Sequence, residues 1–156
     1  MKILVVEDEK YKRDQVLEAL ETMDFDFEIV ISISFNDAIS KVDTDQFDLL
    51  VLDMSLPTYS HQNEDGGGSA QSFGGIDVLR HAEFADNLAP AIFITQYKHF
   101  DQGENELTLE DLRRDLHEEF ERAFVDVVYY RYINETWKET FVNLIKEQLS
   151  KMGRLI

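Results

Sequence analysis

The stretch LLVLDMSLP, residues 49–57, carries the strongest fold signal in the chain. Its four apolar residues, 49–52, predict a strand buried on both faces of a sheet, because such strands form near-continuous hydrophobic runs. The run ends in Asp53, and burial of an unpaired charge is costly. We therefore expect Asp53 to lie at the solvent-facing end of the strand, where its carboxylate has a chemical use.

Four more short apolar segments are predicted to be strands: 2–6, 27–33, 91–95 and 125–130. Segments with helical periodicity separate them: 9–23, 37–42, 75–84, part of 102–124, and a last helix from Glu135. Strands that alternate with helices predict an α/β fold, with a single five-stranded parallel sheet and helices on both faces. The crossovers are expected to be right-handed.

The polar residues that interrupt this pattern follow the strands. Glu7 and Asp8 end the first strand, Asp53 the third and Thr95 the fourth. In open α/β sheets, ligands bind beyond the carboxyl ends of the strands. We expect these four residues to gather on one edge of the sheet.

If Glu7, Asp8 and Asp53 lie within a few ångströms of one another, their carboxylates repel, and the pKa of at least one of them rises unless a cation lies among them. Oxygen ligands without cysteine or clustered histidine suit Mg²⁺. With Mg²⁺ bound, Asp53 stays ionised and can attack phosphorus as a nucleophile. The metal then neutralises charge on the transferring phosphoryl group, and Thr95 can donate its hydroxyl to a phosphoryl oxygen.

Two stretches exceed a minimal fold of this kind. Residues 59–75 form a polar, glycine-rich segment without the GxxxxGK[ST] pattern, and we interpret it as a flexible insertion. Within 102–124, Thr108 begins a capping-box pattern, and leucine and phenylalanine then recur at helical spacing. This pattern predicts an enlarged helical segment with a helix of about four turns, packed on the sheet or, alternatively, presented in part to a partner.

Composition limits the classes of function. Lys and Arg number 15 and Asp and Glu 32, so the formal net charge is −17. Such a chain repels nucleic acid and anionic lipid, so we expect no direct contact with nucleic acid. The absence of cysteine excludes disulfides and thiolate metal sites and fits a cytoplasmic location. The apolar run at 2–6 is too short for a signal peptide or membrane insertion.

Four motifs, in this order, resemble the receiver domains of bacterial response regulators. They are VVEDE at 5–9, LVLDMSLP at 50–57, GIDVL at 75–79 and IFIT at 92–95. The resemblance implies a flavodoxin-like receiver fold with strand order 2-1-3-4-5, an extended loop after strand 3 and an enlarged helix-4 region. It also implies one receiver-like domain over 1–156, with no output domain.

The resemblance further implies roles for single residues. Asp53 would accept a phosphoryl group from a sensor histidine kinase or phosphotransfer protein. Glu7, Asp8, Asp53 and the backbone carbonyl of Ser55 would surround Mg²⁺, and Thr95 would be the switch hydroxyl. The signal would then pass to a downstream protein partner whose identity is unknown.

The sequence departs from the receiver pattern after the fifth strand. Receivers have a Lys-Pro pair there, with the lysine on the phosphoryl group, whereas this chain reads YYRY at 129–132. Arg131 is the best-aligned cation and Lys98 a second candidate, although arginine and lysine differ in reach and donor geometry.

The sequence therefore leaves three candidate functions. The first is a phosphorylation-dependent signalling switch. The second is a degenerate receiver that acts as a constitutive protein–protein interaction module. The third, an aspartyl phosphohydrolase, needs a second acid two residues after the nucleophile. That position is Ser55, so no turnover of external substrates is expected beyond slow loss of the chain's own phosphate.

Overall fold

The computed structural model describes residues 1–57, 70–71, 73–102 and 105–154. Its central sheet has five strands: β1 (Lys2–Val6), β2 (Glu28–Ser32), β3 (Leu49–Asp53), β6 (Ala91–Thr95) and β9 (Phe124–Tyr129). They lie in the order β2-β1-β3-β6-β9, and each neighbouring pair is parallel. Counted over these five strands, this is the predicted order 2-1-3-4-5, so the predicted fold class is confirmed.

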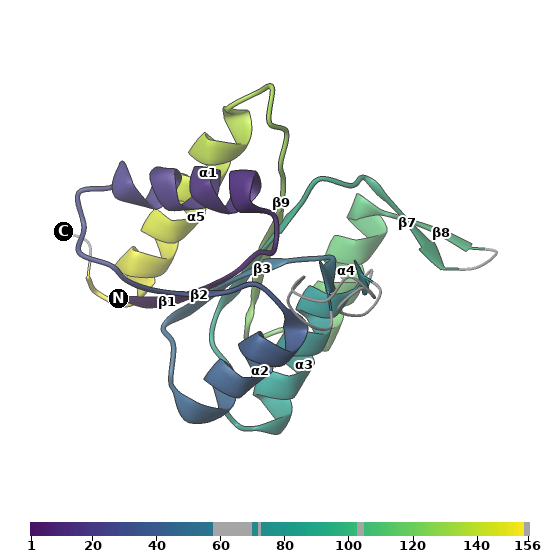
Figure 1. The fold of residues 1–156 in the computed structure, drawn as a ribbon, viewed down its shortest axis with the longest axis horizontal. Helices are drawn as coiled ribbons and strands as arrows, with labels where there is room; N and C mark the ends of the chain where they lie inside the picture. The colour runs from purple at the N-terminus through teal and green to yellow at the C-terminus, as the bar shows by residue number, and fades with distance from the viewer. Residues whose placement is uncertain (58–69, 72, 103–104, 155–156) are drawn as a thin grey trace.

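Helices cover both faces of the sheet (Figure 1). They are α1 (Lys10–Glu21), α2 (Phe35–Thr44), α3 (Gly74–Phe84), α4 (Leu109–Glu119) and α5 (Thr136–Lys151). Helices α1 and α5 lie on one face, and α2, α3 and α4 lie on the other.

Strand β3 shows how the two faces are filled. Leu49 and Val51 join the apolar cluster with α1 and α5, whereas Leu50 and Leu52 join the cluster with α2, α3 and α4. Alternate residues of a strand point to opposite faces, and both faces here are buried. This is the arrangement that the apolar run at 49–52 predicts.

Two antiparallel strand pairs lie outside the central sheet. Strands β4 (Leu56–Pro57) and β5 (Ala70–Gln71) form one, and β7 (His99–Gln102) and β8 (Asn105–Thr108) form the other. The β7–β8 hairpin projects away from the body of the domain (Figure 1). Most of the insertion predicted at 59–75 lies outside the described residues; the described part contains β5 and the start of α3.

The helix predicted within 102–124 is shorter than expected. Thr108 caps α4, and Thr108 and Asp111 form the predicted capping box. The helix has 11 residues, about three turns. Its C-cap Phe120 has a non-helical backbone (φ −122°, ψ 52°), and Phe124 already begins β9. The apolar spacing therefore predicts the end of the helix wrongly. Phe120 and Phe124 do pack against the core, but from a turn and from a strand.

Gly75 allows α3 to lie directly against the end of β3. A Cβ atom at this position would lie 2.1 Å from the carbonyl oxygen of Asp53. We predict that Gly75→Ala lowers the free energy of unfolding by about 3 kcal/mol in urea denaturation.

Gly153→Ala provides the matched control. Gly153 has a φ of +68° with open space around it, so this change should cost only about 1 kcal/mol of backbone strain. Equal losses in the two variants would contradict the close approach at Gly75.

Candidate functional site

The strand register brings the polar strand ends together. Val6 is the partner of Leu52, and Asp53 is the partner of Ile94. Glu7, Asp53 and Thr95 therefore lie at one edge of the sheet. Carboxylate oxygens of Glu7, Asp8 and Asp53 all lie within 4.8 Å of one another, although Asp53 is far from the other two along the chain.

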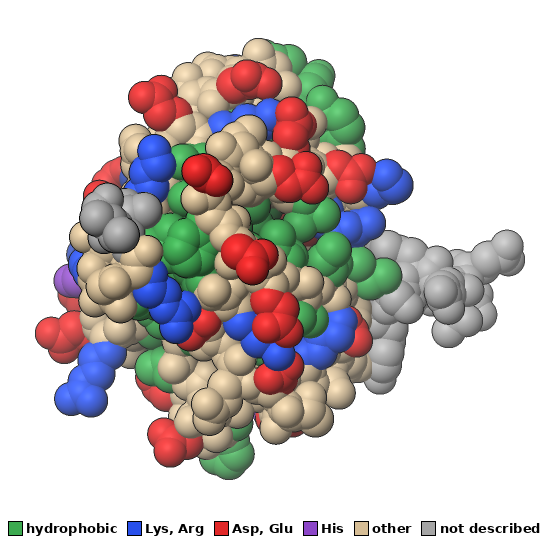
Figure 2. All heavy atoms as spheres, turned by 90° about the vertical axis from the view of Figure 1, so that its left-hand side faces the viewer, with side chains coloured by type: hydrophobic (Ala, Val, Ile, Leu, Met, Phe, Trp, Pro, Cys, Tyr) green, Lys and Arg blue, Asp and Glu red, His purple; other side chains and the backbone are tan. Residues whose placement is uncertain are grey.

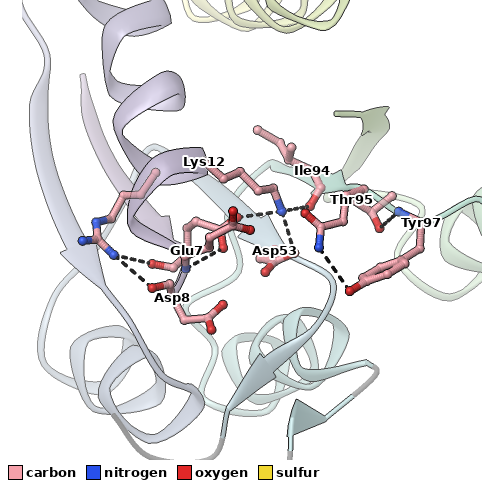
Figure 3. A network of polar contacts seen from close by, with 10 residues as sticks. Glu7, Asp8, Lys12, Asp53, Ile94, Thr95 and Tyr97 are labelled. Carbon is pink, nitrogen blue, oxygen red and sulfur yellow. Dashed lines mark hydrogen bonds and ion pairs between the residues drawn. The ribbon is translucent and has the colours of Figure 1, made fainter. Parts of the chain in front are cut away.

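A buried lysine from α1 enters this cluster (Figure 3). The Lys12 ammonium lies 2.6 Å from Oε1 of Glu7 and 2.8 Å from Oδ1 of Asp53. It also donates a hydrogen bond to the carbonyl oxygen of Ile94 at 3.2 Å. The Lys12 side chain is only 1% exposed, and those of Glu7 and Asp53 are 4% and 10% exposed. Lys12 thus contacts the ends of three neighbouring strands.

Burial and charge set the protonation of the cluster. Burial raises the pKa of Glu7 to about 9; the nearby Asp53 also raises it, and Lys12 opposes both effects. Burial alone would lower the pKa of Lys12, but Asp53 and Glu7 outweigh it, and the pKa of Lys12 is raised. The Lys12 ammonium therefore stays charged, whereas Glu7 takes up a proton more readily than an ordinary glutamate.

The three acids could hold a divalent cation. When all three are ionised, their charge together with that of Lys12 is −2, which one Mg²⁺ neutralises. The donors are carboxylate oxygens that converge within 4.8 Å, and Mg²⁺ takes one or two carboxylates together with water or phosphate oxygens. The residues present fit this ion.

Arg13 and Glu9 hold the acidic pair in place. The guanidinium of Arg13 donates to the carbonyl oxygens of Glu7 and Asp8, at 3.1 and 3.3 Å. The backbone N–H of Glu9 donates to Oε2 of Glu7 at 3.1 Å. Both the backbone and the carboxylate of Glu7 are thereby fixed.

Thr95 ends β6, next to the register partner of Asp53. It is fully buried, and its Oγ1 accepts a hydrogen bond from the backbone N–H of Tyr97 at 3.1 Å (Figure 3). A hydroxyl can accept and donate at once, so this contact leaves its hydrogen for another acceptor.

The other predicted site residues lie as follows. Ser55 is partly buried, two residues beyond Asp53, and the role of its carbonyl in metal binding stays a prediction.

Arg131 is exposed and lines a hollow of about 310 Å³ with Arg113, Asn134 and Trp137. Lys98 is exposed, and its ammonium lies 4.9 Å from the centre of the Tyr129 ring. Among the described ion pairs, Asp53 pairs with Lys12. It pairs with neither Arg131 nor Lys98 among them.

Comparisons with known proteins agree with the fold of the chain. No protein-family model matches the chain. A receiver domain protein (CheY-like) from Methanospirillum hungatei has a similar structure, with a TM-score of 0.62, 19% identity and coverage of 98% of this chain and 96% of that one. The response regulator TrrA from Thermotoga maritima, in complex with Mg²⁺ and BeF, has a TM-score of 0.58 and 23% identity, over 92% and 97% of the two chains. The chain has the receiver fold of response regulators.

Two curated proteins are similar in sequence over nearly their whole lengths. The Detocs response regulatory protein DtcB from Vibrio alginolyticus is 24% identical, over 92% of this chain and 99% of its own. The uncharacterized protein y4jR from Sinorhizobium fredii is 25% identical, over 92% and 95% of the two chains.

Sequence reasoning on this receiver fold missed Lys12. The signal was present, because Lys12 lies four residues before Val16 and so continues the inward stripe of α1, whereas Tyr11 is 54% exposed. A lysine in an apolar stripe that leads toward acidic strand ends indicates a buried ion pair.

We predict that Lys12→Met lowers the free energy of unfolding by about 3 kcal/mol, because it leaves the buried side chains of Asp53 and Glu7 without the cation that contacts both. Urea denaturation measures this loss. Lys10→Met is the control, since the Lys10 side chain is 80% exposed and should cost at most about 0.5 kcal/mol. A Lys12→Met variant as stable as wild type would show that the ion pairs are not formed in solution.

We also predict that Asp8→Asn weakens Mg²⁺ binding by about tenfold or more, because it removes one anionic ligand. Isothermal titration with MgCl₂ gives the dissociation constants. Asp14→Asn is the control, as this acid lies on α1 and pairs with Lys10 outside the cluster. If wild type and Asp8→Asn bind Mg²⁺ with equal affinity, Asp8 is not a ligand of the metal.

Proposed function

We propose that the protein is a phosphorylation-dependent signalling switch. Asp53 accepts a phosphoryl group from a sensor histidine kinase or phosphotransfer protein, and phosphorylation changes binding to a downstream protein. The observation that carries the proposal is the convergence of Glu7, Asp8 and Asp53 at the carboxyl edge of a receiver-fold sheet. The similarity to a receiver solved with Mg²⁺ and BeF and to a response regulatory protein supports it.

Each residue has a defined task in this proposal. An oxygen of Asp53 attacks phosphorus, while Lys12 holds Oδ1 of that carboxylate. Glu7, Asp8, Asp53 and the Ser55 carbonyl would hold Mg²⁺, which supplies positive charge to the transferring phosphoryl group. Thr95 donates its hydroxyl to a phosphoryl oxygen. The proposal includes no turnover of an external substrate, because the residue two positions after Asp53 is a serine.

The surface is consistent with a protein partner. Acidic and basic side chains are interspersed over the face in Figure 2, with no basic stripe across it. With a net charge of −17, contact with nucleic acid is disfavoured. Among the helices of the described residues, none combines the length and the apolar character that a membrane span requires. A cytoplasmic location is part of the proposal.

A second candidate is a degenerate receiver that binds its partner constitutively. The observation that favours it is Lys12, whose ammonium lies 2.6 Å from Glu7 and 2.8 Å from Asp53 and so neutralises part of the negative charge that would attract Mg²⁺. In that case Asp53→Ala would leave partner binding unchanged.

Phosphorylation by a small-molecule donor tests the proposal without knowledge of the kinase. Wild type incubated with phosphoramidate and Mg²⁺ should gain about 80 Da, one phosphoryl group, in intact-mass spectrometry. Hydroxylamine should remove the added mass, since it cleaves acyl phosphates.

Asp53→Asn should gain no mass, and Asp48→Asn is the control, as this acid pairs with Arg154 and the backbone N–H of Lys2. Unmodified wild type would contradict the switch and favour the constitutive module. Modification of Asp53→Asn would place the phosphoryl group elsewhere.

A further inference from the structure

Tyr130 lies in the stretch after the fifth strand where the sequence departs from the Lys-Pro pair of receivers. Tyr130 directly follows β9, and its backbone N–H donates to the carbonyl oxygen of Thr95 at 2.7 Å. Its ring is buried, packs on Trp137 with 4.9 Å between ring centroids, and lies 5.8 Å from the Lys12 ammonium. Tyr130 therefore fills the space beside the acidic cluster but brings no positive charge to it.

We propose that Lys12, delivered by α1, is the cation that binds the phosphoryl group on Asp53. This inference rests on the proposed function and deepens it. Its basis is geometric, because the ammonium already lies 2.8 Å from Oδ1 of the attacking carboxylate and is shielded from solvent.

The three donors of Lys12 are directed by the surrounding fold. They meet Glu7, Asp53 and the carbonyl oxygen of Ile94, at 2.6, 2.8 and 3.2 Å. The Glu7 contact is the shortest and the Ile94 contact the longest, so Glu7 anchors the ammonium while a donor on its other side can turn to a phosphoryl oxygen. Ile94 directly precedes Thr95, so such a turn would loosen a contact next to the switch hydroxyl.

The transfer step balances with these groups. An Asp53 oxygen forms a bond to phosphorus, and the bond from phosphorus to the leaving nitrogen breaks. With phosphoramidate, the electron pair of that bond stays on nitrogen and ammonia leaves. The carboxylate becomes an acyl phosphate whose oxygens carry two negative charges, and a positive group fixed beside them stabilises the charge as it shifts.

Variants of Lys12 distinguish an effect on phosphoryl transfer from an effect on metal binding. Lys12→Met should slow phosphorylation by phosphoramidate about 100-fold, the cost of one pre-placed charged donor. It should retain or tighten Mg²⁺ binding, because a positive charge beside the ligands is gone. Lys12→Arg should recover part of the rate, and Lys10→Met should react like wild type. A merely structural role would lower metal binding and reaction rate together.

A second measurement needs no destabilised variant. In ¹⁵N-lysine-labelled protein, the Nζ resonance of Lys12 is identified as the one that is missing from the spectrum of Lys12→Arg. In wild type, beryllofluoride with Mg²⁺ should shift this resonance, and Mg²⁺ alone should shift it less. A folded Lys12→Met protein that reacts at the wild-type rate, or an unmoved Nζ resonance in the beryllofluoride complex, would overturn the inference. So would loss of reaction in Arg131→Ala but not in Lys12→Met.

The outcomes also distinguish this inference from the function on which it rests. If wild type itself gains no phosphoryl group, the proposed switch fails and the inference fails with it. If wild type reacts on Asp53 and Lys12→Met reacts equally fast, the switch stands and only the role of Lys12 is lost.

Discussion

The ammonium of Lys12 is the contact on which the edge of the sheet depends. It meets Glu7 after β1, Asp53 at the end of β3 and the backbone of Ile94 in β6. A buried cation with two carboxylates is costly to form and more costly to break, because loss of one partner leaves the others unpaired. One side chain thus holds three neighbouring strand ends in a fixed relation, and it does so where the proposed chemistry takes place.

The same contact sets the electrostatics of the site. Lys12 compensates part of the charge on Glu7 and Asp53, yet burial still raises the pKa of Glu7 to about 9. The cluster therefore favours further positive charge, which a divalent ion supplies. In the proposed switch, a phosphoryl group on Asp53 increases the negative charge again. A lysine held by Glu7 on one side can follow that change, which is how a local modification could reach the backbone beside Thr95.

The fold was predictable because its signals are local. The run at 49–52 indicates a strand buried on both faces, and β1 and β6 have the predicted bounds. The acidic cluster followed from strand ends meeting at one edge. Lys12 was missed because a lysine on a helix is usually exposed, and only its place in the stripe with Val16 marks it as buried. The β7–β8 hairpin was missed because residues 102–124 are predicted as one enlarged helical segment, whereas β8 ends at Thr108, the N-cap of α4.

A crystal structure of the wild-type protein with Mg²⁺ and beryllofluoride would show which cation contacts the group bound to Asp53. We expect the beryllium group on a carboxylate oxygen of Asp53, Mg²⁺ against Asp8 and Asp53, and the Lys12 ammonium on a fluorine atom. A beryllium group bound elsewhere, or one contacted by Arg131 while Lys12 lies apart, would contradict this expectation.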